Sequence, residues 1–181
     1  MNYTIDNLFS LAITQKITAT KITMRMYNDQ INTRSLPHTV ARLQKLLPSV
    51  LLTECYNDEN LPFSIEVRNT EIGHLFEHIL LEYLCQLKIA KGHNSAVFSG
   101  RTRWNWVRDP RGMFHISLDC GQKDAELLPI ALEKSIKLMK IILKDNNSSF
   151  FNLPSFSFLN NGLKNGKKYF LKARHKHFSK K

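Results

Sequence analysis

The sequence lacks any hydrophobic run long enough to cross a membrane. Its 181 residues are 43% hydrophobic, which is enough for a core, yet no stretch approaches the roughly 18 apolar residues that a spanning helix needs. The N-terminus reads MNYTIDNLFSLAITQK and has neither the basic start nor the small-residue cleavage site of a signal peptide. We therefore expect a cytoplasmic protein with no membrane contact.

Cysteine is scarce, and a phosphate-binding loop is missing. The three cysteines, Cys55, Cys85 and Cys120, are far apart and form no CxxC pair. This pattern predicts reduced thiols and argues against a cysteine-based zinc cluster. No GxxxxGK[ST] motif occurs, so the sequence does not predict an ATP-dependent ligase.

Acidic residues are also few, with 15 Asp and Glu against 26 Lys and Arg. Eight of the basic residues lie in 164–181, which contains no acid, so the first 163 residues carry about +3 of the total +11 (11 − 8). We expect a folded domain over 1–145, followed by a Ser/Asn/Phe linker and basic tail over 146–181. Such a tail could bind an acidic partner or nucleic acid, although a solvated chain end is the simpler interpretation.

Hydrophobic periodicity predicts an α+β domain. Alternating residues predict strands over 17–27 and 63–67, and a hairpin formed by 97–104 and 113–119. Helical spacing predicts a helix from about 36 to 47 and two long helices, over 70–90 and 124–143. The expected architecture is a mainly antiparallel sheet with the two long helices packed on one face. Residues 1–16 are weakly patterned.

The motif that carries chemistry lies on the first long helix. His74 and His78 are four residues apart, so they share one helix face and could bind one Zn²⁺ ion. Glu77 completes an HxxEH pattern and would act as the general base on a water molecule that the metal activates. The apolar stripe of this helix leaves these polar residues on its free side. Two histidines at this spacing also commonly serve only in packing.

Several motifs together resemble the N-terminal domain of cyanophycin synthetase over roughly 36–142. They are Leu46-Leu47-Pro48-Ser49, the Cys55 segment, the Thr70–His78 run and Gly100-Arg101-Thr102-Arg103. The resemblance implies a domain that binds cyanophycin, a polymer with a poly-aspartate backbone and arginine side chains. In some members the domain also resembles a pitrilysin-type metallopeptidase that cuts the polymer.

A third metal ligand must come from outside the two histidines. Glu82 is excluded, because His74, His78 and Glu82 together span about 12 Å of helix at 1.5 Å per residue. Asp119 ends the second hairpin strand and aligns with an acidic position in the family. Glu126 is the alternative, since pitrilysin-like enzymes take this ligand from a later helix. We predict Asp119.

Two functions follow from this motif. The first is a zinc-dependent peptidase that hydrolyses peptides or cyanophycin-like polymer, with Arg101 and Arg103 binding a substrate carboxylate or oxyanion through their planar guanidinium groups. The second is a non-catalytic module that binds polymer or a partner. The sequence does not indicate an oligomeric state.

Overall fold

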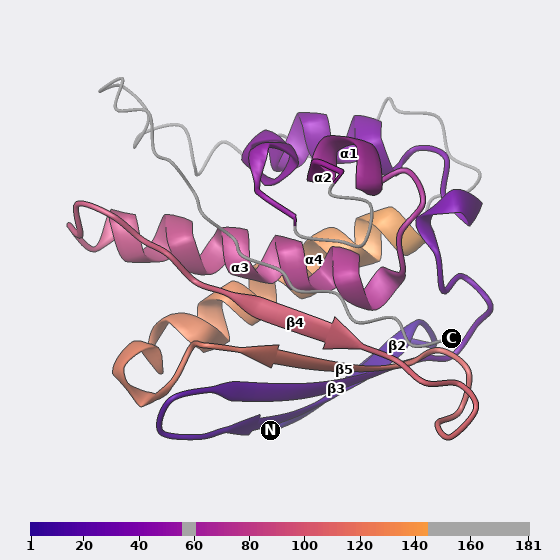
Figure 1. Ribbon diagram of the computed structural model, residues 1–181, viewed down its shortest axis with the longest axis horizontal. Helices are drawn as coiled ribbons and strands as arrows, with labels where there is room; N and C mark the ends of the chain where they lie inside the picture. The colour runs from indigo at the N-terminus through magenta and orange to yellow at the C-terminus, as the bar shows by residue number, and fades with distance from the viewer. Residues whose placement is uncertain (56–60, 145–181) are drawn as a thin grey trace.

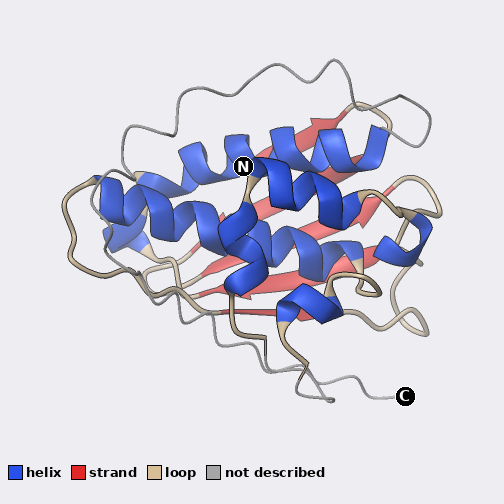
Figure 2. Cartoon of the chain, turned by 90° about the horizontal axis from the view of Figure 1, so that it is seen from above, coloured by secondary structure: helices blue, strands red, loops and turns tan. Residues whose placement is uncertain are grey.

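A five-stranded antiparallel sheet with helices packed on one face forms the domain, which confirms the predicted fold class (Figure 1). The computed structural model describes residues 1–55 and 61–144. The strands are β1 (Asn2–Ile5), β2 (Phe9–Gln15), β3 (Thr20–Met26), β4 (Gly100–Arg103) and β5 (Met113–Leu118). Seen from above, the helices cover the sheet (Figure 2).

The strand order in the sheet is β1-β2-β3-β5-β4. Residues 1–26 form three consecutive antiparallel strands, and β5 then pairs with β3 so that Ile22 lies opposite Ile116. The predicted hairpin is present, with Thr102 of β4 opposite Ile116 of β5. This order leaves β4 at one edge of the sheet and β1 at the other. The weakly patterned N-terminus therefore supplies two strands.

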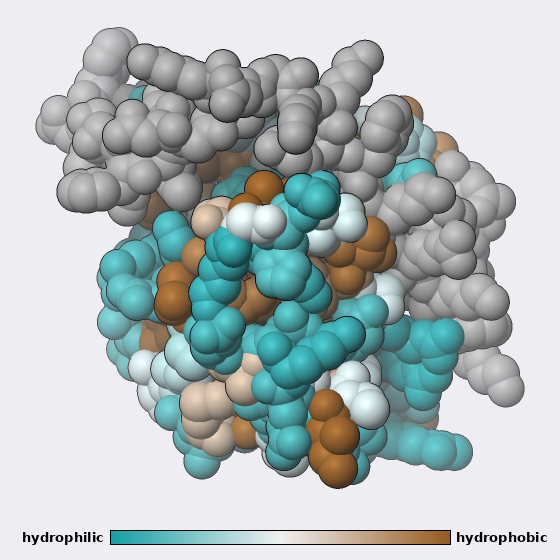
Figure 3. Space-filling model, turned by 90° about the vertical axis from the view of Figure 1, so that its left-hand side faces the viewer, coloured by the Kyte–Doolittle hydropathy of each residue, from teal (hydrophilic) through white to brown (hydrophobic). Residues whose placement is uncertain are grey.

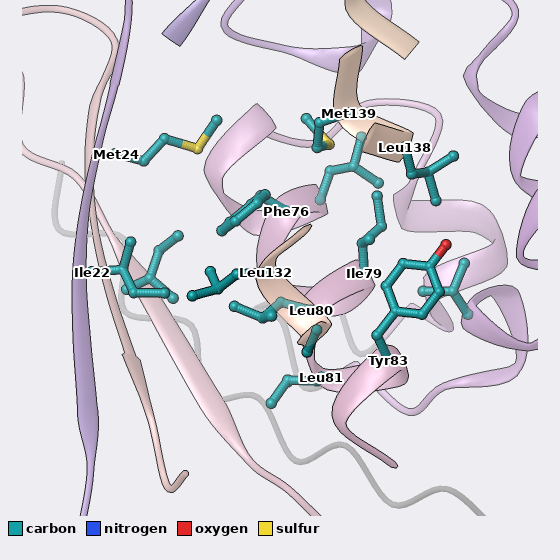
Figure 4. Close-up of a cluster of buried hydrophobic side chains, with 14 of the residues drawn as sticks. Ile22, Met24, Phe76, Ile79, Leu80, Leu81, Tyr83, Leu132, Leu138 and Met139 are labelled. Carbon is teal, nitrogen blue, oxygen red and sulfur yellow. The ribbon is translucent and has the colours of Figure 1, made fainter. Parts of the chain in front are cut away.

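Two long helices provide most of the cover over the sheet. The helical elements are α1 (Thr39–Leu46), α2 (Phe63–Glu66), α3 (Ile72–Ala90) and α4 (Leu127–Lys144), with 3₁₀ turns η1 (Thr33–Ser35), η2 (Pro48–Leu52) and η3 (Gln122–Asp124). Figure 4 shows Phe76 and Leu80 of α3 and Leu132 and Met139 of α4 meeting Ile22 and Met24 of the sheet. All six side chains are buried, so α3 lies at the centre of the core.

The strand predicted over 63–67 is wrong, because Phe63–Glu66 forms the short helix α2. Pro62 precedes it, and its carbonyl accepts hydrogen bonds from Ile65 and Glu66 N–H groups. Phe63 and Val67 are both buried and are four residues apart, which is one helical turn. A five-residue run with apolar ends fits either period, so only its packing decides between strand and helix.

The prediction that the polar residues of α3 lie on a free side of the helix is also wrong. His74, Glu77, His78 and Glu82 are all at most 2% exposed. The helix is covered on the side away from the sheet by η2 and α2. The polar residues are therefore enclosed between two layers, where each one requires a hydrogen-bond partner or a charge partner.

No helix within the described ranges is long and apolar enough to cross a membrane. The end of the molecule near the β2–β3 turn is mainly hydrophilic, with hydrophobic residues in small groups (Figure 3). The predicted linker and basic tail, 146–181, lie outside the described residues.

Candidate metal centre

Two histidine rings meet beneath the short elements that cover α3. The Nε2 atoms of His74 and His78 are 3.2 Å apart, and the Sγ atom of Cys55 lies 3.5 Å from His74 Nε2. The ligand atoms of these three residues all lie within 4.8 Å of one another. Cys55 follows η2, so a segment about 20 residues upstream in the chain completes the cluster.

The helix start brings its first histidine into place. Thr70 precedes α3, and its backbone N–H donates to Thr33 Oγ1, while its carbonyl accepts from Thr33 N–H. The Thr70 hydroxyl lies 2.8 Å from His74 Nδ1. Glu71 occupies the N-cap position of α3 and makes no side-chain cap bond. The Thr70 side chain instead orients a histidine ring.

The second ring is held from two sides. His78 Nδ1 lies 2.9 Å from Thr53 Oγ1, whose own hydroxyl donates to the Val50 carbonyl at 2.7 Å. Because the only hydroxyl proton of Thr53 is used in that bond, His78 Nδ1 must donate to Thr53. A neutral His78 ring then presents an unprotonated Nε2. Phe63 stacks on the same ring, with centroids 3.6 Å apart and planes 12° apart.

A complete chain of hydrogen bonds follows for the metal-free cluster. The Thr70 hydroxyl donates to His74 Nδ1, and His74 Nε2–H donates to the unprotonated Nε2 of His78. His78 Nδ1–H then donates to Thr53. All four ring nitrogens are satisfied in this arrangement, which explains how two histidines can be buried. Binding a metal would move the His74 proton to Nδ1, with Thr70 as its acceptor.

Two of the three donor-atom separations match those around a tetrahedral zinc ion. Ligands at about 2.05 Å for nitrogen and 2.3 Å for sulfur would place two nitrogens about 3.3 Å apart and a nitrogen and a sulfur about 3.5 Å apart. The two His Nε2 atoms are 3.2 Å apart and Cys55 Sγ is 3.5 Å from His74 Nε2, while all three ligand atoms lie within 4.8 Å of one another. Threonine hydroxyls on both Nδ1 atoms supply the outer hydrogen bonds that usually orient metal-binding histidines. A sulfur and two imidazoles also suit Zn²⁺ better than Mg²⁺ or Ca²⁺.

Glu77 points toward the sheet. The Thr102 hydroxyl of β4 donates to Glu77 Oε2, and Oε1 lies beside Gly100. A Cβ at position 100 would overlap that carboxylate, so the glycine makes room for it. Glu77 is fully buried but is not among the three residues whose ligand atoms gather.

Asp119 lies at the outer end of β5 instead of at the histidines. Its carboxylate accepts from the Ser99 N–H and hydroxyl, both at 2.8 Å, and the residue is exposed. Asp119 instead acts on Cys85: burial raises the pKa of that thiol to about 12, and the charges of Glu82 and Asp119 add to the effect. Cys85 is seven residues beyond His78, or about 10 Å along α3, so Asp119 lies near a later part of the helix than the histidines. Glu126 is likewise remote and pairs with Lys91 at the surface.

Arg101 and Arg103 flank Thr102, so strand alternation directs them to the opposite face of the sheet. Thr102 is buried against α3, whereas Arg101 is half-buried and Arg103 is exposed. The structure thus brings His74 and His78 together but separates them from both arginines. The position of Cys55 beside the histidines was not predicted, because the sequence contains no CxxC pair that would mark a cysteine as a metal ligand.

The fold and the cluster define a small α+β domain with a buried Cys-His-His group. Residues 21–143 match the family described as the cyanophycin synthase-like N-terminal domain, and the chain belongs to this family. The match confirms the resemblance noted in the sequence. Comparison with curated proteins and with solved structures gave no match.

Proposed function

We propose that this domain is a binding module for a peptide or a cyanophycin-like polymer, built around a Zn²⁺ ion held by Cys55, His74 and His78. The observation that carries the metal assignment is the pair of threonine-oriented rings whose Nε2 atoms are 3.2 Å apart beside a thiol. Polymer binding is what membership of the family suggests. Zinc would connect the segment after η2 to α3 and so stabilise the side of the domain that covers the helix.

Binding without hydrolysis is favoured by the position of Glu77. A general base must reach the proton that it removes, within about 3 Å or through one water molecule. The Glu77 carboxylate instead hydrogen-bonds to Thr102 and lies against Gly100 on the sheet side of α3. Both histidines and Cys55 are also buried, which limits the approach of a polymer to the cluster.

Metal titration tests the zinc site directly. The chelator-treated chain should take up one Zn²⁺ per molecule, and Co²⁺ in its place should show thiolate-to-cobalt charge-transfer absorption. Cys55→Ser should abolish that absorption and weaken binding at least about 100-fold. Cys85→Ser is the matched control, because Cys85 is buried but lies outside the cluster. A chain that binds no metal in a stoichiometric amount, or a Cys55→Ser variant with the original spectrum, would overturn the assignment.

Hydrolysis is the second candidate, because the HxxEH pattern places a buried carboxylate between two metal-ligand histidines. A bound zinc ion would supply Lewis-acid activation of water or of a carbonyl group. Glu77 would have to leave Thr102 to act as the base. Release of fragments from peptides and from cyanophycin, measured on the zinc-loaded chain, tests this candidate.

A Glu77→Gln variant decides between the two functions. If the domain is a peptidase, the variant should keep its zinc and lose turnover. If the domain only binds, the zinc-loaded wild type should show no turnover to lose, while polymer binding persists in both proteins. A cytoplasmic location belongs to this proposal, because Cys55 must stay reduced to act as a ligand. An acidic or nucleic-acid partner for the basic tail stays a prediction.

A further inference from the structure

A buried carboxyl group lies one helical turn beyond the metal cluster. Glu82 follows His78 by four residues on the same face of α3 and is only 2% exposed. Its Oε1 atom accepts hydrogen bonds from the Ser49 hydroxyl at 2.6 Å and from Gln86 Nε2 at 2.8 Å. Its Oε2 atom is buried and has no hydrogen-bond partner within residues 1–55 and 61–144.

Burial of this carboxyl group destabilises the folded domain. A buried oxygen that makes no hydrogen bond is unfavourable, and a leucine of similar length would fill the space without that cost. A polar group in such a position is best explained by what it holds in place. Glu82 holds Ser49, which lies in the first turn of η2, and Gln86 closes the group because its Nε2 atom also lies 3.2 Å from Ser49 Oγ.

The segment that contains η2 runs antiparallel to α3 and contacts it once in each turn of the helix. Three contacts share this arrangement, each between one residue of the segment and one of the helix: Ser49 with Glu82, Thr53 with His78, and Cys55 with His74. The helix residues are four apart, so successive contacts are about 6 Å apart along α3. Two of the contacts involve the metal ligands, and the third involves Glu82.

The position of η2 sets the surroundings of the second histidine. Ser49 lies near the start of η2, and Thr53 directly follows its last residue. The Thr53 hydroxyl bonds the Val50 carbonyl at 2.7 Å and lies 2.9 Å from His78 Nδ1. A five-residue 3₁₀ turn has few hydrogen bonds of its own, so contacts at its two ends determine where it lies against α3.

We propose that Glu82 is a positioning residue for the metal centre, which acts through Ser49 and η2 to hold Thr53 and Cys55 against the two histidines. Glu82 is too far along the helix to be a ligand itself. Its role is to fix the far end of η2, so that the near end meets the ligands in the correct register. This inference rests on the zinc site of the proposed function.

Zn²⁺ affinity of substituted full-length chains tests this role. Glu82→Leu and Ser49→Ala both remove the contact and should weaken binding about threefold to tenfold, which is less than the loss of a direct partner of a ligand causes. Glu82→Gln keeps an acceptor oxygen for Ser49 and should stay within about twofold of the wild type. Circular dichroism verifies that each variant is folded, and Ser49→Ala decides the question if Glu82→Leu does not fold.

Ser99→Ala is the matched control. The Ser99 hydroxyl also bonds a carboxylate, that of Asp119, at 2.8 Å, but this pair does not contact η2. Its removal should change the affinity by less than about twofold, because distant sites act independently. Equal losses in Ser99→Ala and Ser49→Ala, or in Glu82→Gln and Glu82→Leu, would overturn the proposal.

A double variant tests whether Glu82 acts through Ser49. Ser49→Ala/Glu82→Leu should bind Zn²⁺ no more weakly than the weaker of the two single variants, since all three lack the same hydrogen bond. Losses that multiply in the double variant would show that the two residues act separately, which contradicts the proposed route through η2.

Imidazole nitrogen NMR of the metal-free chain gives a readout that does not need zinc. Glu82→Leu should shift the signals of His78, whose Nδ1 atom faces Thr53, more than those of His74, whose Nδ1 atom faces Thr70 outside η2. A wild type that binds no metal would refute the zinc site, while this shift would still test the role of Glu82. Unchanged His78 signals together with unchanged zinc affinity would overturn that role and leave the zinc site intact.

Discussion

The two faces of the sheet draw on the same strands but have opposite chemistry. On β4, Thr102 points inward and bonds the buried carboxylate of Glu77, while its neighbours Arg101 and Arg103 point outward. The inner face packs against α3, whose opposite side carries the histidine cluster under η2 and α2, and the outer face carries exposed cations. The side chains of the motif Gly100-Arg101-Thr102-Arg103 are thus divided between the two faces of the sheet, because side chains alternate along a strand.

The largest expected effect is on the inner face, at Gly73. A Cβ there would come within 2.6 Å of the Phe114 Cβ and overlap its ring, so α3 can approach β5 only with glycine at this position. Gly73→Val should lower the free energy of unfolding by about 3 kcal/mol, measured by urea denaturation.

Gly92→Asn is the control for this substitution. Gly92 has a positive φ of 91° but open space around it, so asparagine there should cost about 1 kcal/mol or less. Equal losses for the two variants would contradict the close contact between α3 and β5.

The second largest expected effect is the increase in the free energy of unfolding on zinc binding. At a free concentration 100 times the dissociation constant, binding adds about 2.7 kcal/mol to the free energy of unfolding. Thermal unfolding with and without zinc should show this increment in the wild type and in Cys85→Ser, but not in Cys55→Ser. The same increment in all three proteins would mean that zinc binds elsewhere.

A smaller effect should depend on pH through Glu82, which is buried beside the cluster. Burial raises the pKa of this carboxyl, although hydrogen bonds from Ser49 and Gln86 partly oppose the shift. The folded protein therefore binds this proton more tightly than the unfolded chain, whose pKa is about 4.3. The stabilisation that Glu82 contributes is therefore complete below about pH 4.3. It declines as the pH rises through the higher pKa that Glu82 has in the folded protein.

Glu82→Gln removes this dependence, because glutamine stays neutral at every pH. The variant should therefore gain stability relative to the wild type as the pH rises from about 4 to 8. Urea denaturation across that range measures the difference between the two proteins. A difference that does not change with pH would show that Glu82 does not titrate between the folded and unfolded states in this way.

The smallest effect on stability should come from the outer face. Arg101→Ser/Arg103→Ser should change the free energy of unfolding by about 0.5 kcal/mol or less, since neither side chain is in the core. Thr102→Val, between them, should cost about 1–3 kcal/mol, because it leaves a buried carboxylate without its hydroxyl donor. Urea denaturation of the two variants compares the faces on one strand, and equal losses would contradict their separation.

Much of the fold could be predicted from local patterns. The strand predicted over 17–27 contains β3, and the two long helices are α3 and α4. The hairpin of β4 and β5 is also confirmed. These segments have long or regular hydrophobic periods, which are the most informative signals in a sequence. The run at 63–67 is too short for its period to distinguish a helical turn from a strand.

The sequence by itself determined the α+β class, the helix that carries His74, Glu77 and His78, and the family. Only the tertiary structure decided which residues those three meet. Cys55, Thr53 and Thr70 reach the histidines because η2 and the start of α3 pack together, while Glu77 turns to β4. Such contacts join segments far apart in the chain, and no spacing rule within one helix specifies them.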